Sequence, residues 1–184
     1  IILLVVAVIT FNETLGIKQT LLFNDSIIID YLSSFMKIVT LLAAFWALLI
    51  SSNYLETFKI FKIEYPILIL SSVLGMMVMI SSNDLIVFYM GLELQSLALY
   101  VLATFNRDQL KSSEAGLKYF VLSALSSGLL LYGCSLIYGF TGSTNFNLIA
   151  GQLNDDQYAL TFGIVFILVG LAFKISAVPF HMWA

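Results

Sequence analysis

The chain has 184 residues, of which 60% are hydrophobic and 10% are charged, with a formal net charge of −3 and a mean hydropathy of +1.00. Soluble domains average about 45–50% apolar and about 25% charged residues, so this composition excludes a soluble globular domain and indicates an integral membrane protein. Lys and Arg are few and never clustered, which argues against a nucleic-acid site. With one cysteine and one histidine, the chain cannot hold a disulfide framework, a thiolate metal site or a multi-histidine haem site by itself.

Six apolar runs predict an all-α, polytopic transmembrane helix bundle in which residues 1–184 form a single domain. About 20 helical residues cross a hydrocarbon core about 30 Å thick. The predicted helices cover residues 1–9, 31–50, 65–80, 85–105, 114–140 and 158–178, the first and last being incomplete spans. Both ends of the chain lie in apolar sequence, so we expect a fragment of a longer or split subunit.

The loops between these runs predict the orientation. Lys59, Lys62, Arg107 and Lys111 lie in the loops 51–64 and 106–114, whereas the loops on the opposite side contain only Lys18. The positive-inside rule therefore places the basic loops on the cytoplasmic or matrix side. Ser81–Asp84 is expected to form a tight turn, and Ser112 or Ser113 to cap the fifth helix.

Glu93 lies near the middle of the run 85–105, roughly 13 Å from its start at the rise of a helix. An ionised group at this depth is costly unless it faces protein, water or a counter-charge, which makes Glu93 a candidate functional residue. Tyr89, Glu93, Ser96 and Tyr100 share one helical stripe, which we expect to face the protein interior. The alternative is a structural, hydrogen-bonded carboxyl group.

Lys118 and Lys174 are the basic residues that could share a proton with Glu93. Burial disfavours the charged form of either group and an ion pair favours it, so protonation of a Glu–Lys pair can depend on its geometry. Lys118 enters the fifth run about one turn from its start. We predict from helix pairing that Lys118 lies near Glu93.

Lys174 precedes a predicted break in the last helix. It shares a helical face with Gly163 and Gly170, whose small size leaves room for a neighbouring helix or for water. Pro179 cannot continue a helix and disfavours helical conformation at Val178, which predicts a broken helix near Pro179. A lysine before such a break is typical of discontinuous helices in ion-translocating proteins, and helix C-terminal carbonyl groups favour a cation. The alternative is an interfacial lysine whose ammonium group reaches the membrane surface.

The single histidine and the single cysteine are predicted to differ in role. His181 follows the break and could pass protons between Lys174 and a later segment. A structural histidine beside Trp183 is at least as good an interpretation. Cys134 lies in an apolar run and is predicted to be a small buried apolar residue.

Three segments, in the same order and spacing, resemble one protein family. They are Gly91–Leu97, Glu114–Tyr119 and Gly170–Trp183. These segments resemble the antiporter-like membrane subunits of respiratory complex I, the family of NADH:ubiquinone oxidoreductase chain 2, called chain N in bacteria. The resemblance extends from about Asn24 onward. It implies the first repeat of an antiporter-like inverted-repeat fold, with the broken helix near Pro179.

The resemblance also implies roles for individual residues. Glu93 matches the family's fifth-helix glutamate, Lys118 its sixth-helix lysine and Lys174 the lysine at the broken helix. With His181, these are the expected proton-transfer residues, and none of them is a redox centre. The resemblance implies no cofactor in this chain, because NADH, FMN, iron–sulfur clusters and ubiquinone are expected in other subunits. The expected partners are other membrane-arm subunits, lipids and a second chain or segment that carries the remaining helices.

The function that the resemblance implies is coupling of NADH:ubiquinone electron transfer to proton pumping, as a non-redox subunit of the H⁺-translocating reductase. One alternative is a subunit of a cation/proton antiporter or of a membrane-bound hydrogenase-type complex, because residues 178–183 have similar forms across that superfamily. A structural membrane scaffold is a further alternative. Lysine outnumbers arginine, and Ile and Phe are abundant, which fits an AT-rich genome such as that of a mitochondrion or an intracellular bacterium. We expect the mitochondrial inner membrane, with the bacterial plasma membrane as the alternative.

Overall fold

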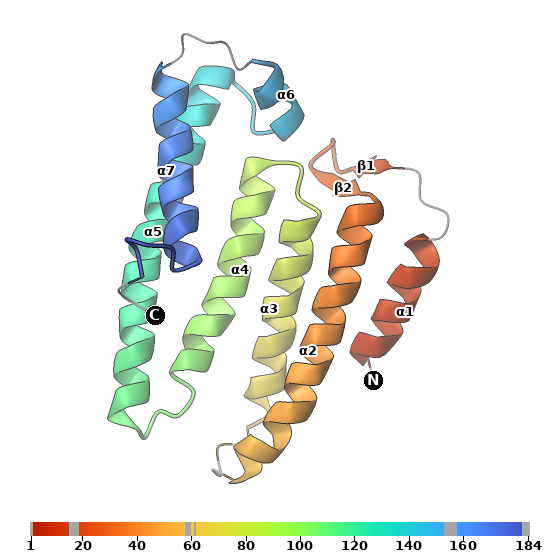
Figure 1. The fold of residues 1–184 in the computed structure, drawn as a ribbon, viewed down its shortest axis with the longest axis vertical. Coiled ribbons are helices and arrows are strands. Elements are labelled where there is room, and N and C mark those ends of the chain that lie inside the picture. The colour runs from red at the N-terminus through yellow and green to blue at the C-terminus, as the bar shows by residue number, and fades with distance from the viewer. Residues whose placement is uncertain (1, 15–18, 58–59, 61, 153–157, 182–184) are drawn as a thin grey trace.

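The computed structural model describes residues 2–14, 19–57, 60, 62–152 and 158–181. In this part of the chain, α1 to α4 lie side by side in chain order, α5 follows α4, and α7 pairs with α5 at one edge (Figure 1). The long helices are α1 (Ile2–Thr14), α2 (Tyr31–Thr57), α3 (Glu64–Ile80), α4 (Leu85–Ala103), α5 (Leu110–Thr141) and α7 (Tyr158–Lys174). By length and composition, α2, α4 and α5 could cross a membrane, and the other three are shorter apolar helices. The predicted all-α bundle is confirmed.

Several helices differ in length from the prediction; among them, α1 continues to Thr14 rather than ending at Ile9. Helix α2 continues to Thr57, and α5 begins at Leu110 rather than at Glu114. The predicted capping of α5 is wrong, because Ser112 Oγ donates to the carbonyl oxygen of Ala103 (2.8 Å) instead of accepting from a helix N–H group. Ser113 Oγ likewise donates to a carbonyl oxygen in the preceding loop. The first bond therefore attaches the start of α5 to the end of α4, and the second attaches it to the α4–α5 loop.

The loops at one end of the bundle form structure that was not predicted. The first loop contains an antiparallel hairpin of β1 (Thr20–Leu22) and β2 (Ile27–Ile29), and the loop after α5 contains the short helix α6 (Phe146–Gly151). The side-chain amides of Asn83 and Asn145 both donate to the carbonyl oxygen of Asp25, at 2.8 and 3.1 Å. The hairpin, the α3–α4 turn and the loop before α6 are thereby joined.

Asp84 ends the predicted turn and caps α4. Its Oδ1 accepts from the backbone N–H groups of Ile86 (2.8 Å) and Val87 (3.3 Å), and its Oδ2 accepts from the hydroxyl group of Thr144. Asp84 is buried. One carboxylate therefore accepts hydrogen bonds from the first backbone N–H groups of α4 and attaches this end of the helix to the α5–α6 loop.

The opposite end of the bundle contains the basic loops. Lys62, Arg107 and Lys111 belong to the α2–α3 connection, the α4–α5 loop and the start of α5, which lie together (Figure 1). Lys18 and Lys59 fall outside the described residues. The grouping agrees with the predicted topology, and its assignment to the cytoplasmic side stays a prediction.

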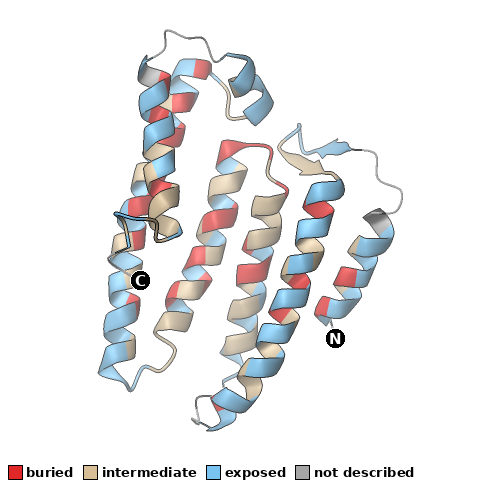
Figure 2. Ribbon diagram, viewed as in Figure 1, coloured by how far each residue is buried: buried red, intermediate tan, exposed pale blue. Residues whose placement is uncertain are grey.

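Buried residues form two clusters between helices. One cluster joins α1, α2 and α3, and the other joins α4, α5 and α7. Cys134 belongs to the second cluster and is 5% exposed, which confirms its predicted burial. Large apolar side chains cover much of the outer helix faces, and Figure 2 shows many exposed positions along α1, α2, α5 and α7.

Glycines bring the helices of each close pair together. A Cβ atom on Gly75 of α3 would lie 2.7 Å from the carbonyl oxygen of Gly91 of α4. A Cβ on Gly170 of α7 would lie 2.7 Å from the Cβ of Leu130 on α5. Small residues allow such close approach between apolar helices. The α3–α4 and α5–α7 pairs thus form two tightly packed units, and α4 and α5 meet between them.

Candidate ion-pair site between α4, α5 and α7

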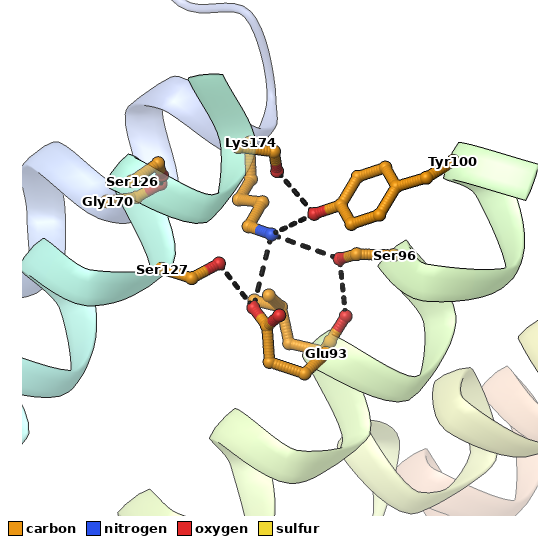
Figure 3. Close-up of polar contacts among 9 residues, drawn as sticks. Glu93, Ser96, Tyr100, Ser126, Ser127, Gly170 and Lys174 are labelled. Carbon is orange, nitrogen blue, oxygen red and sulfur yellow. Dashed lines mark hydrogen bonds and ion pairs between the residues drawn. The ribbon is translucent and has the colours of Figure 1, made fainter. Parts of the chain in front are cut away.

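Lys174, the last residue of α7, places its ammonium group against one face of α4 (Figure 3). Its Nζ lies 3.2 Å from Glu93 Oε1, 3.1 Å from Ser96 Oγ and 3.0 Å from the hydroxyl oxygen of Tyr100. The side chains of Lys174 and Glu93 are 10% and 20% exposed. An ammonium group has three N–H donors, and these three oxygens satisfy all of them.

The acceptor groups belong to the predicted stripe of α4. Glu93, Ser96 and Tyr100 follow one another at helical spacing, so a single face of the helix carries all three oxygens. The prediction that this stripe faces the protein interior is confirmed for these residues. The Nζ of Lys174 also lies 5.7 Å from the centroid of the Tyr100 ring, within the range of a cation–π contact.

Two serines of α5 form hydrogen bonds with Glu93 and Tyr100. Ser127 Oγ donates to Glu93 Oε1 at 2.5 Å, and the hydroxyl group of Tyr100 donates to Ser123 Oγ at 2.6 Å. Both serines are buried. The ion pair therefore has partners on α4, α5 and α7.

The structure corrects the position of the helix break. Helix α7 ends at Lys174, before the predicted end at Val178. Ser176 has a φ of 55°, its N–H donates to the carbonyl oxygen of Phe173, and the Ala177 N–H donates to that of Ala172. This pair of bonds around a left-handed residue is a Schellman ending. The break therefore comes from Ser176, and Pro179, which follows a cis peptide bond, lies beyond it.

Packing against α5 sets how far along α5 the end of α7 lies. Ser126 Oγ donates to the carbonyl oxygen of Gly170 at 3.0 Å, one turn before Lys174. Ser126 lies near the middle of α5, so α7 ends about halfway along that helix (Figure 1). The ammonium group is thereby held inside the bundle, where the Lys174 side chain is 10% exposed.

The predicted contact between Glu93 and Lys118 is wrong. Lys118 Nζ lies 2.5 Å from Glu114 Oε1, and their side chains are 65% and 55% exposed in this chain. Glu93 instead meets α5 at Ser127, about 13 Å further along the helix than Lys118 at the helical rise. Lys118 therefore pairs within its own helix at i, i+4.

The other candidate residue, His181, does not join the cluster. It is exposed and lies beyond the end of α7. The described residues show no hydrogen bond or ion pair for His181, and Trp183 falls outside them. Its predicted role stays a prediction.

A cavity of about 240 Å³ reaches Lys174 from the α3–α4 side. Gln95, Ser96, Tyr119 and Lys174 are its polar lining residues, and the rest of its wall is mostly apolar. A cavity of this size with several polar groups is suited to hold water. In the described part of the chain, no group of three or more His, Cys, Asp or Glu residues could hold a metal ion.

The sequence interpretation missed Ser123 and Ser127 as partners of the site. Small residues in membrane helices usually serve close helix packing, which hides such a role in the sequence. Their spacing of four residues places two hydroxyl groups on one face of the helix. That pattern indicates hydrogen bonding toward a polar neighbour.

Comparison with curated proteins gives relatives over nearly the whole chain. The chain is 73% identical over 182 residues to NADH-quinone oxidoreductase subunit N of Pelagibacter ubique, covering 99% of this chain and 38% of that protein. Further relatives, at 51–60% identity, have the same name and are also bacterial. The chain thus spans well under half the length of the curated relatives that it matches.

Comparison with solved structures gives the same fold. A chain of respiratory complex I from Thermus thermophilus with bound aureothin matches with a TM-score of 0.80 and 30% identity, covering 98% of this chain and 38% of that one. A chain of the Mrp complex from Dietzia sp. matches with a TM-score of 0.69 and 30% identity, covering 85% and 29%. Residues 82–184 match the family model of the NADH:quinone oxidoreductase/Mrp antiporter transmembrane region. The chain is therefore a membrane protein that belongs to the NADH:quinone oxidoreductase/Mrp antiporter family.

Proposed function

We propose that this chain is part of a proton-translocating, antiporter-like subunit in the membrane arm of an NADH–quinone oxidoreductase. The observation that carries the proposal is the largely buried ion pair of Glu93 and Lys174. Ionisable groups inside membrane segments are costly and mark ion pathways. The relatives named NADH-quinone oxidoreductase subunit N support this choice of complex.

The geometry indicates how the pair can hold or release one proton. When Lys174 is an ammonium group, it donates to Glu93 Oε1 and to two hydroxyl oxygens. Loss of one proton leaves a neutral amine, which no longer balances the charge of Glu93, while Ser127 still donates to the carboxylate. A displacement of α7 relative to α4 would change the attraction and with it the affinity of Lys174 for its proton.

Lys118 and His181 complete the proposed proton-transfer residues. Lys118 and Glu114 form a second ionisable pair near the start of α5, at the basic end of the bundle. His181 lies beyond Lys174, where it can pass a proton to a later segment. Both would act in series with the Glu93–Lys174 pair.

The redox chemistry belongs elsewhere in the proposed complex. NADH, FMN, iron–sulfur clusters and ubiquinone would be bound by other subunits, and this chain would contribute no cofactor site. Its partners would be other membrane-arm subunits, lipids and the segment or chain with the remaining helices. The bacterial relatives do not support the mitochondrial inner membrane, and we place the chain in a bacterial plasma membrane.

The proposal is tested by replacing Lys174 with Met in the full-length subunit. Lys174→Met removes the charge but keeps an unbranched side chain, so protons pumped per NADH oxidised should fall while NADH oxidation continues. Lys111→Met is the matched control, because Lys111 is exposed at the start of α5. An unchanged ratio for Lys174→Met would contradict proton transfer and favour the structural scaffold.

The second candidate function is a subunit of a cation/proton antiporter complex. The likeness to a chain of the Mrp complex is the observation that favours it. Co-purification distinguishes the two proposals. An assembly that oxidises NADH supports the first, whereas an assembly without that activity supports the second.

A further inference from the structure

We propose that Glu93, Ser96 and Tyr100 form a binding site for a monovalent cation of ammonium size, which Lys174 fills with its own side chain. The inference rests on the proposed function, since it concerns the ion specificity of the same site. It predicts that the site remains competent to bind a free cation when the lysine side chain is shortened.

The first argument is the coordination of the ammonium group. One carboxylate and two hydroxyl oxygens surround Lys174 Nζ at 3.0–3.2 Å. The single negative charge of Glu93 balances a single positive charge. Mg²⁺ and Ca²⁺ need oxygens at about 2.0–2.6 Å, so this spacing suits a larger, singly charged ion. Ammonium and K⁺, which are similar in radius, fit better than the smaller Na⁺.

The second argument is that other contacts orient the oxygens. Ser96 Oγ donates to the carbonyl oxygen of Leu92 (2.6 Å), and the Tyr100 hydroxyl group donates to Ser123 Oγ (2.6 Å). Each hydroxyl therefore presents lone pairs to Lys174. Ser127 holds the Glu93 carboxylate. None of these bonds involves Lys174, so removal of the lysine leaves the oxygens aimed at the same point.

The third argument is access to the site. Ser96 and Lys174 line the cavity of about 240 Å³, with Gln95 and Tyr119 as further polar groups. Water in this cavity could supply the remaining ligands of a bound ion. The Tyr100 ring adds a cation–π contact that also suits methylammonium.

The test is chemical rescue of Lys174→Ala in the full-length subunit within its membrane complex. Sealed vesicles are energised with NADH, and the membrane potential is followed with a voltage-sensitive dye, because ammonia dissipates a pH gradient but not a potential. Ammonium, methylammonium, K⁺, Na⁺ and tetramethylammonium are added as chloride salts. The NADH oxidation rate is recorded alongside.

The variant should form a reduced potential, and ammonium or methylammonium should restore it with a saturable dependence on concentration. Tetramethylammonium, which is much larger than ammonium, should have no effect, and Na⁺ should act less than K⁺. Adding Ser96→Ala or Tyr100→Phe should raise the half-saturating ammonium concentration about tenfold, the effect of one lost bond to a charged group. Ser71→Ala is the control, because Ser71 Oγ donates to a carbonyl oxygen one turn earlier, away from the site.

Three results separate the inference from the proposed function. A full potential for Lys174→Ala without any added cation would contradict the proposed function. A lost potential that no cation restores would overturn the cation site alone. Rescue that is equal with and without Ser96→Ala would also overturn it, because the oxygens would then not be the ligands.

Assembly provides a second measurement if Lys174→Ala lowers the amount of complex. A ligand that binds only the native state stabilises it, so ammonium present during membrane extraction should increase the assembled fraction. Tetramethylammonium should not. An assembled fraction that is the same in both salts would contradict the site.

Discussion

Replacing Gly170 with Ala tests how the position of Lys174 is set. A Cβ at position 170 would lie 2.7 Å from Leu130 Cβ and 3.2 Å from both Leu130 Cα and the carbonyl oxygen of Ser126. Carbon atoms pack at about 3.5–4.0 Å, so α7 would have to move by roughly 1 Å. Leu130 is 0% exposed and cannot yield into solvent. We therefore expect the Ser126–Gly170 hydrogen bond to weaken and Lys174, one turn later, to shift from Glu93.

The magnitude follows from two opposing effects. Overpacking costs about 1–3 kcal/mol, whereas Ala is favoured over Gly in a helix by about 1 kcal/mol. Gly128→Ala in α5 is the matched control, because a Cβ there would meet no atom within 4 Å. The difference between the two variants removes the helix-propensity gain and leaves about 1–3 kcal/mol of steric cost.

The assay compares the thermal stability and the protons pumped per NADH of the two variants in the full-length subunit. Gly170→Ala should melt at a lower temperature than Gly128→Ala and should pump fewer protons. Equal melting temperatures and equal pumping would refute the reasoning, because they would show that the α5–α7 contact tolerates an added methyl group.

Two further predictions concern side-chain interactions. Glu93→Gln and Lys174→Met should each lower thermal stability. The double variant should lose about 0.5–3 kcal/mol less stability than the sum of the two single losses. As a control, the same double-mutant cycle on the exposed pair of Glu114 and Lys118 should show no measurable coupling energy. Additivity within error for the buried pair would contradict the contact. Asp84→Ala should lower stability by about 0.5–2 kcal/mol through loss of the α4 cap. The control is Asp84→Asn, which keeps a side-chain acceptor. Equal melting temperatures of the Ala and Asn variants would argue against capping.

The helix order and the stripe of α4 could be predicted because both depend on local sequence. Apolar runs long enough to cross a bilayer locate the helices, and helical periodicity places Ser96 and Tyr100 on the face of Glu93. Helix ends were less predictable. Pro179 suggested the break of α7, but the left-handed conformation of Ser176 ends the helix earlier, and a serine carries no strong signal for that conformation.

The choice of partner for Glu93 could not be predicted from periodicity. The sequence by itself determined that the chain lies in a membrane, that a carboxylate lies inside an apolar helix and that two lysines could reach it. Only the tertiary structure decided that Lys174 pairs with Glu93 and that Lys118 pairs with Glu114. The physical reason is that helical spacing fixes the face of a side chain within one helix, whereas the offset along the axis between helices depends on how their surfaces pack. Here that offset is set by Gly170 and Ser126, where α7 fits against α5.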